Sequence, residues 1–167
     1  MAAGVTYVPI ASNTLGSDAS SVTFSSIPST YTDLVIVAWT KPFSGSEGSI
    51  KMNFNSDTGS NYSNTYLSGD GSTASSGRNT NATSIALSTG NSLNNPRQPV
   101  YITQIFNYAN TTTYKTALTR TSEGATYVDA WVGLWRSTSA ITTVTYNITY
   151  LNIGAGSTFS LYGILAA

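Results

Sequence analysis

The feature that most constrains the fold of this chain is an alternation of apolar and polar residues with a period of two. In TTVTYNITYL (142–151), Val144 and Tyr146 share one face of an extended backbone, and threonine and asparagine side chains occupy the other face. SIKMNFN (49–55) and SSVTFSSI (20–27) repeat the pattern. No stretch of ten or more residues shows the i, i+3, i+4 spacing of a helix. The alternation predicts strands with one face in a core and the other in water.

A second set of segments is apolar on both faces. It comprises LVIVAW (34–39), VGLW (132–135) and PVYITQIFNY (99–108). Such runs are typical of central strands that are covered on both sides, either within one chain or by a partner subunit.

Four more segments have strand-like composition: VTYVPI (5–10), TSIAL (83–87), TTYKTALTR (112–120) and STFSLYGIL (157–165). About nine or ten strands result, separated by clusters of Gly, Ser, Asn and Asp that favour turns. We therefore predict one all-β domain over residues 1–167, an antiparallel β-sandwich. A jelly roll is the first choice and another Greek-key sandwich the second. The terminal segment is expected to be a paired, interior strand.

Residues 56–82 do not follow the strand rhythm and are predicted to form a long irregular surface loop. They contain four glycines and are anchored by Tyr62, Tyr66 and Leu67. Loops of this length in a compact domain tend to be functional or disordered. Tyrosine with Ser, Asn and Gly is the mixture found in adaptable binding surfaces. A second irregular segment is NSLNNPRQP (91–99).

Charge is scarce, because the 167 residues include only seven Lys plus Arg and seven Asp plus Glu. Ser, Thr and Asn supply most of the polarity, so the expected surface is neutral and rich in hydrogen-bonding groups. Such a surface has no field that attracts nucleic acid or anionic membranes, and we expect neither as a partner. No apolar run is long enough to span a bilayer, and the start MAAGVTYVPIAS lacks the basic region of a signal peptide.

Catalytic residues are few, since the chain has neither histidine nor cysteine. This excludes Ser-His and Cys-His pairs and thiolate metal sites. Most acidic residues stand in turn-like contexts. The exception is Asp129, which is expected to pair with Arg120 or Arg136 on a neighbouring strand. A Ser-Lys dyad would need a buried lysine, whereas all three lysines are expected near strand surfaces: Lys41, Lys51 and Lys115. We predict a protein that is not an enzyme and holds no cofactor.

A calcium loop is faintly suggested by Asn53, Asn55 and Asp57 at alternate positions. The segment lacks the glycine and the closing glutamate of such loops, and the two asparagines equally fit the outward face of a strand. No metal site is assigned.

Aromatic residues are the most informative class, with 11 tyrosines and 3 tryptophans. Trp131 and Trp135 are four residues apart, which places them on the same face of a strand. Core packing explains such a pair simply. The alternatives are a subunit interface or a platform for sugar rings. The candidate contacts for a partner or a glycan are therefore Tyr62, Tyr66, Arg78, Trp131 and Trp135.

Five stretches together resemble a group of short virion structural proteins of tailed bacteriophages: YTDLVIV (31–37), SNYSNTYLSGDGS (60–72), NYANTTTYKTALTR (107–120), VGLWRSTSAITTVTY (132–146) and STFSLYGI (157–164). The resemblance implies a non-enzymatic β-sandwich on the particle surface, assembled in the host cytoplasm. It supplies no catalytic residue. Trimers are typical of such proteins, so a homotrimer is expected by analogy.

Two roles follow from the resemblance. The first is an oligomeric head decoration (cement) protein that holds the major capsid protein through apolar strand faces and the N-terminal segment. The second is the tip of a tail fibre or spike, in which residues 56–82 bind host surface polysaccharide by stacking and hydrogen bonding.

Overall fold

The structure is a computed structural model that describes residues 6–41, 49–89, 98–123, 127–148 and 152–165. The described residues form twelve β-strands and no helix. The strands make two sheets, and every pair of neighbouring strands is antiparallel.

The larger sheet has eight strands, in the order β1 (Tyr7–Thr14), β12 (Thr158–Ile164), β3 (Asp33–Trp39), β8 (Val100–Phe106), β9 (Lys115–Glu123), β10 (Tyr127–Trp135), β5 (Tyr62–Gly69) and β6 (Ala74–Ala82). The smaller sheet has four strands, in the order β2 (Ser21–Phe24), β11 (Val144–Ile148), β4 (Ile50–Phe54) and β7 (Ile85–Ala86).

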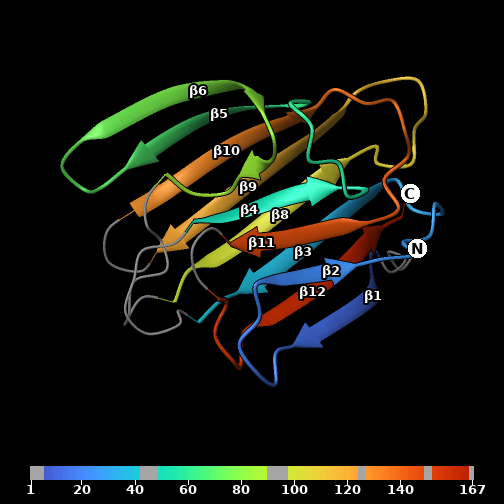
Figure 1. Cartoon of the computed structure of the whole chain (residues 1–167), viewed down its shortest axis with the longest axis horizontal. Helices are drawn as coiled ribbons and strands as arrows, with labels where there is room; N and C mark the ends of the chain where they lie inside the picture. Colours follow the sequence, from blue (N-terminus) through green and yellow to red (C-terminus); the bar gives the residue numbers. More distant parts are fainter. Residues whose placement is uncertain (1–5, 42–48, 90–97, 124–126, 149–151, 166–167) are drawn as a thin grey trace, which may run out of the picture.

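The two sheets lie face to face, with β2, β11 and β4 in front of the larger sheet (Figure 1). The predicted all-β sandwich is confirmed, although the described residues contain twelve strands instead of nine or ten. Strands that are distant in sequence lie side by side, such as β12 beside β3 and β11 beside β4. Jelly rolls and other Greek-key sandwiches share this crossed connectivity.

The alternating segments behave as expected. Val144 and Tyr146 of β11 are buried, as are Met52 and Phe54 of β4. Strand β12 lies between β1 and β3, which confirms the prediction of a paired, interior strand.

A buried hydrogen bond in the core joins β11 of the smaller sheet to β8 of the larger one. Tyr146 on β11 is fully buried, and its hydroxyl lies 3.1 Å from Oγ1 of Thr103 on β8. That threonine shares a second bond of 2.9 Å with the hydroxyl of Thr119 on β9. The tyrosine ring meets Phe159 of β12 edge-on, at 5.5 Å between centroids. A buried hydroxyl therefore has a partner, as a packed core requires.

The irregular loop predicted for residues 56–82 is wrong, because β5 and β6 form a hairpin there. Gly71 has a φ of +87° in the connecting turn, and the Asp70 carboxylate accepts bonds from the Ser72 and Thr73 amides. The pattern is hidden because β6 forms the edge of the sheet and is polar on both faces. Of the second irregular segment, 91–99, residues 91–97 lie outside the described residues.

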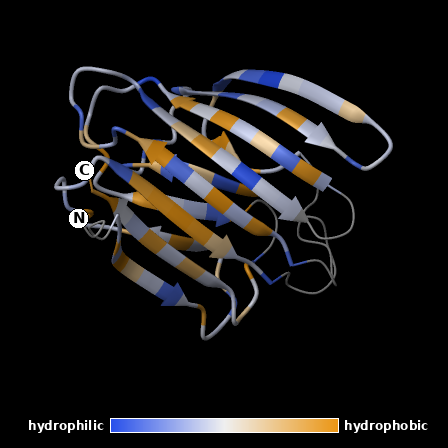
Figure 2. Cartoon of the chain, turned by 180° about the vertical axis from the view of Figure 1, so that it is seen from behind, coloured by the Kyte–Doolittle hydropathy of each residue, from blue (hydrophilic) through white to orange (hydrophobic). Residues whose placement is uncertain are grey.

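The unequal width of the two sheets leaves part of the larger one uncovered. The β5–β6 hairpin extends beyond the smaller sheet at one side and β1 at the other (Figure 1). We call the face of the eight-stranded sheet that is turned away from the smaller sheet the outer face. No described strand covers it (Figure 2).

Candidate functional site

The two tryptophans of β10 lie on the same face of the strand, as predicted, and each is 3% exposed. Trp135 belongs to the core. It stacks on Tyr62 at 6.4 Å with an interplanar angle of 16°, and its indole Nε1 donates to Asp57 Oδ2 at 2.7 Å. The hydroxyl of Tyr62 is also buried, and it donates to the Asp57 carbonyl oxygen at 3.0 Å. Tyr62 and Trp135 were candidate contacts for a partner, but their burial removes them from the surface.

The environment of the Asp57 carboxylate should make the stability of the fold depend on pH. The hydrogen bond from Trp135 is the main cause that lowers the Asp57 pKa, helped by Asn61 and the Gly59 amide and opposed by burial. A carboxyl group whose pKa is lower in the folded state stabilises the fold above its unfolded pKa of about 3.9, and this stability is lost as the pH falls further. We expect Asp57→Asn to lose less of its melting temperature than wild type between about pH 5 and pH 3.

The measurement is thermal unfolding of both proteins across this range. Asparagine keeps an oxygen that can accept from Trp135, so the variant is expected to fold at pH 7. Parallel melting curves over the whole range would contradict the role of Asp57.

Trp131 and Tyr66 form a second aromatic pair, outside the core cluster. Their rings stack at 4.5 Å with an interplanar angle of 27°. The Tyr66 ring lies on the bare backbone of Gly77, where an added Cβ would lie 2.6 Å from its Cε1. Both rings line a hollow of about 370 Å³ between the β5–β6 hairpin and the segment that follows β7. We call it the Trp131 hollow; Asn79 and Thr89 also line it.

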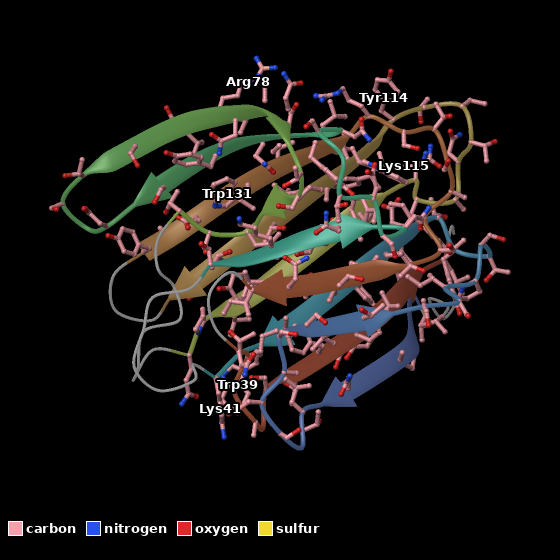
Figure 3. All side chains as sticks on the ribbon, in the orientation of Figure 1. Trp39, Lys41, Arg78, Tyr114, Lys115 and Trp131 are labelled. Carbon is pink, nitrogen blue, oxygen red and sulfur yellow. The ribbon has the colours of Figure 1, made fainter. Side chains whose placement is uncertain are left out.

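Arg78 borders this hollow through its place on β6 but turns away from it. It lies opposite Thr65, whereas its neighbour Gly77 lies opposite Tyr66, so the alternation of the strand directs the arginine to the other face. Figure 3 shows Arg78 at the outer margin of β6, well away from Trp131. The structure therefore brings Tyr66 and Trp131 together and directs the Arg78 side chain to the other face of the hairpin.

Asp129 is buried beside the Trp131 hollow, and the expected arginine partner is wrong. Its carboxylate accepts from the Thr89 amide at 2.9 Å and from the Thr89 hydroxyl at 3.0 Å. Arg136 instead donates to Ser63 Oγ at 2.8 Å and to Asn81 Oδ1 at 3.0 Å. Arg120 lies opposite Ala130, one residue beyond Asp129, and therefore points to the outer face. The partner of Asp129 is therefore Thr89, in the segment after β7. No residue near Asp129 in the sequence predicts this contact.

The outer face carries an apolar patch that sequence reasoning did not place. Val132 on β10 is 50% exposed, Val128 on the same strand 67%, and Leu67 on β5 65%. Leu67 lies directly opposite Ala130, which completes the group. Figure 2 shows further apolar bands on neighbouring strands of this face. We call Leu67, Val128, Ala130 and Val132 the outer patch. The run VGLW was expected to be covered on both sides, but nothing in the described chain covers Val132.

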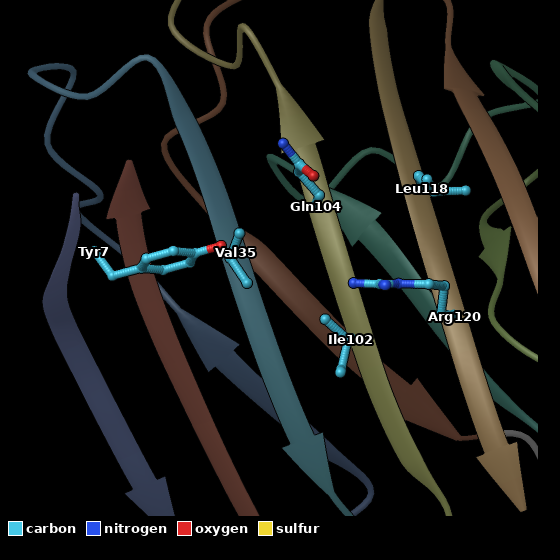
Figure 4. A pocket seen from close by; sticks show the side chains of 6 residues that line it. All are labelled: Tyr7, Val35, Ile102, Gln104, Leu118 and Arg120. Atoms are coloured by element: carbon cyan, nitrogen blue, oxygen red, sulfur yellow. The ribbon is translucent and has the colours of Figure 1, made fainter. Parts of the chain in front are cut away.

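A shallow hollow of about 260 Å³ continues the outer face toward β1. Tyr7 reaches over β12 from one side and Arg120 over β8 from the other, above Val35 and Ile102 (Figure 4). Arg120 is exposed and forms no ion pair or side-chain hydrogen bond within the described residues. The outer face thus combines aliphatic side chains with two arginines, Arg120 on β9 and Arg78 on β6.

Lys115 is fully buried, so its predicted place at the surface is wrong. Its ammonium group donates to the carbonyl oxygens of Thr113 at 2.7 Å and Thr138 at 3.2 Å. Burial lowers the Lys115 pKa. Because both partners are backbone carbonyls, this lysine fastens two turns together.

The three residues of the suggested calcium loop all have protein partners. Asn53 Nδ2 donates to the carbonyls of Asp57 and Thr83, Asn55 Oδ1 accepts from the Thr142 amide, and Asp57 accepts from Trp135. No group of three or more acidic, histidine or cysteine side chains suited to a metal ion exists among the described residues. The same residues include no helix that could cross a membrane.

The outer face and the Trp131 hollow are thus the two surfaces with binding character. Comparison with known proteins assigns neither of them a role, since no protein-family model and no curated protein matches this chain.

Proposed function

We propose that this protein is a non-enzymatic structural protein of a tailed-bacteriophage particle, most simply an oligomeric decoration or cement protein on the capsid. The outer patch carries this proposal. Exposed aliphatic side chains gathered on one flat sheet face are typical of surfaces that other proteins cover. The resemblance of the sequence to short virion proteins supports the same role and points to a homotrimer.

The size of the outer face suits a stable interface. Eight strands about 4.8 Å apart, each about seven residues long at ~3.3 Å per residue, span roughly 900 Å². A standard protein interface buries about 800 Å² on each partner. The mixture of valine, leucine and two arginines also fits, since interface centres are poor in charge and arginine is the cation most often found there.

The test is the oligomeric state of the purified protein. We expect wild type to be oligomeric by light scattering and the double variant Leu67→Lys/Val132→Lys to be monomeric, because two ammonium groups would have to be buried in the interface. Ser21→Lys on β2 is the matched control. It adds one ammonium group, half the charge of the double variant, at an exposed site on the smaller sheet and should leave the oligomer intact.

A monomeric wild type, or a double variant that keeps its oligomer, would contradict the use of this face. Antibody labelling of particles of the phage that encodes the protein then shows where on the particle the protein lies. Labelled heads support decoration, and labelled tail tips support a fibre or spike instead. In the first case, particles that lack the protein are expected to release DNA at lower temperature.

A further inference from the structure

The Trp131 hollow contains a buried donor without an acceptor. Trp131 and Trp135 lie on the same strand and are equally buried as residues, yet among the described residues only the Trp135 indole has a partner, Asp57. Nε1 of Trp131 has no hydrogen-bond partner within the part of the chain that the structure describes. Buried indole N–H groups usually find one. A ligand that brings an acceptor would complete the site.

The other groups around the hollow are neutral hydrogen-bonding groups. Asn79 lies opposite Asn64, on the same face as Gly77 and Tyr66, and its amide makes no hydrogen bond within the described residues. Thr89 is engaged by Asp129, whose carboxylate disfavours an anion at this place. Arg78 is also among the lining residues, but its place opposite Thr65 directs its side chain to the other face of β6.

Tyr66 forms one wall of the hollow. Its ring is half-buried and packs directly on the backbone of Gly77. Since Nε1 of Trp131 is closed to solvent, a ligand reaches it when a neighbouring ring shifts outward, and Tyr66 is the ring that stacks on the indole. Two aromatic rings beside amide and hydroxyl groups are the chemistry that recognises a sugar ring, which has apolar C–H faces and hydroxyl edges.

We propose that the Trp131 hollow binds a neutral sugar unit of a glycan. The sugar ring packs against Tyr66, a hydroxyl oxygen accepts from Trp131 Nε1, and the Asn79 amide bonds a second hydroxyl. The volume of about 370 Å³ is that of a small ligand site. This inference goes beyond the proposed structural role and does not depend on it, because a decoration protein and a spike could both use such a site.

The test begins with titration of four neutral trisaccharides: cellotriose, maltotriose, mannotriose and tri-N-acetylchitotriose. Saturation-transfer NMR and calorimetry measure binding, with sialyllactose as the anionic comparison. We expect at least one neutral trisaccharide to bind. Trp131→Phe, which keeps a ring but removes the N–H group, and Asn79→Ala are each expected to weaken binding about tenfold, the effect of one lost hydrogen bond.

Ser76→Ala is the matched control, because Ser76 lies on the same strand but opposite Leu67 on the outer face. It should bind like wild type, and thermal melting must show that all three variants are folded. No binding by any neutral trisaccharide at about 10 mM, well above the Kd of weak ligands, would overturn the proposal. Equal binding by wild type, Trp131→Phe and Asn79→Ala, or preference for sialyllactose, would overturn it too. The variant Leu67→Lys/Val132→Lys should still bind sugar. Its result therefore distinguishes a wrong prediction about oligomerisation from a wrong prediction about sugar binding.

Discussion

Replacing Gly133 with valine is expected to destabilise the protein by about 3 kcal/mol, the upper part of the usual range for overpacking a core. Gly133 lies on β10 where Ile85 of β7 crosses it. A Cβ at this position would lie 2.5 Å from Ile85 Cγ2 and 2.7 Å from Cδ1. Because Ile85 is 1% exposed, it has no solvent to move into. The extra side chain would push β7 away from the larger sheet. Urea denaturation measures the loss.

Gly69→Ala on the adjacent β5 is the control for the intrinsic effect of replacing a strand glycine. Its Cβ would meet only Val128 Cγ1, at an ordinary 3.8 Å. A double variant isolates the contact itself, since Ile85→Ala removes the atoms that collide. We expect Gly133→Ala to cost little in the Ile85→Ala background and much more in wild type. If the free energy of unfolding of Gly133→Val lies within about 0.5 kcal/mol of the wild-type value, β7 does not pack as closely on Gly133 as described.

The sequence predicts the strands of this fold where one face is buried and the other wet. β2, β4 and β11 were found for that reason, since burial imposes alternation on their residues. The β5–β6 hairpin was missed because β6 is an edge strand with polar residues on both faces, so burial leaves no period in it. The turn at Asp70 in SGDGS was the available signal.

The candidate site was predictable only in part. The spacing of Trp131 and Trp135 fixes their common face, but it cannot say which indole has a partner. That partner, Asp57, is 78 residues away from Trp135, and the partner of Asp129 is Thr89, 40 residues earlier. Such pairings arise from the packing of the sheets and leave no local pattern. A loop over 56–82 would allow Arg78 to join the aromatic residues, but on a strand Arg78 follows the alternation and faces away from Tyr66.

Removing the side chain of Tyr146 is expected to cause the largest loss of stability, about 4 kcal/mol for Tyr146→Ala, the range for emptying a large aromatic site in a core. Tyr146 is fully buried on the central part of the smaller sheet and packs edge-on against Phe159 of the larger one. Deleting it would leave a cavity between the sheets and remove the only partner that Thr103 has on β11 among the described residues. Urea denaturation measures this loss as well.

Tyr146→Phe separates packing from hydrogen bonding, since it keeps the ring and removes the hydroxyl. We expect it to cost about 1 kcal/mol, and less when Thr103 is valine, because the two oxygens then no longer depend on each other. The variant also has a pH signature. Burial raises the Tyr146 pKa, so this residue stabilises the fold below the unfolded value of about 10, and that contribution is lost as the pH rises further. Tyr146→Phe should therefore lose less stability than wild type above about pH 10. If the two proteins weaken equally with alkali and Thr103→Val leaves the cost of Tyr146→Phe unchanged, the hydroxyl does not join the sheets, and packing of the ring alone must account for the whole effect of alanine.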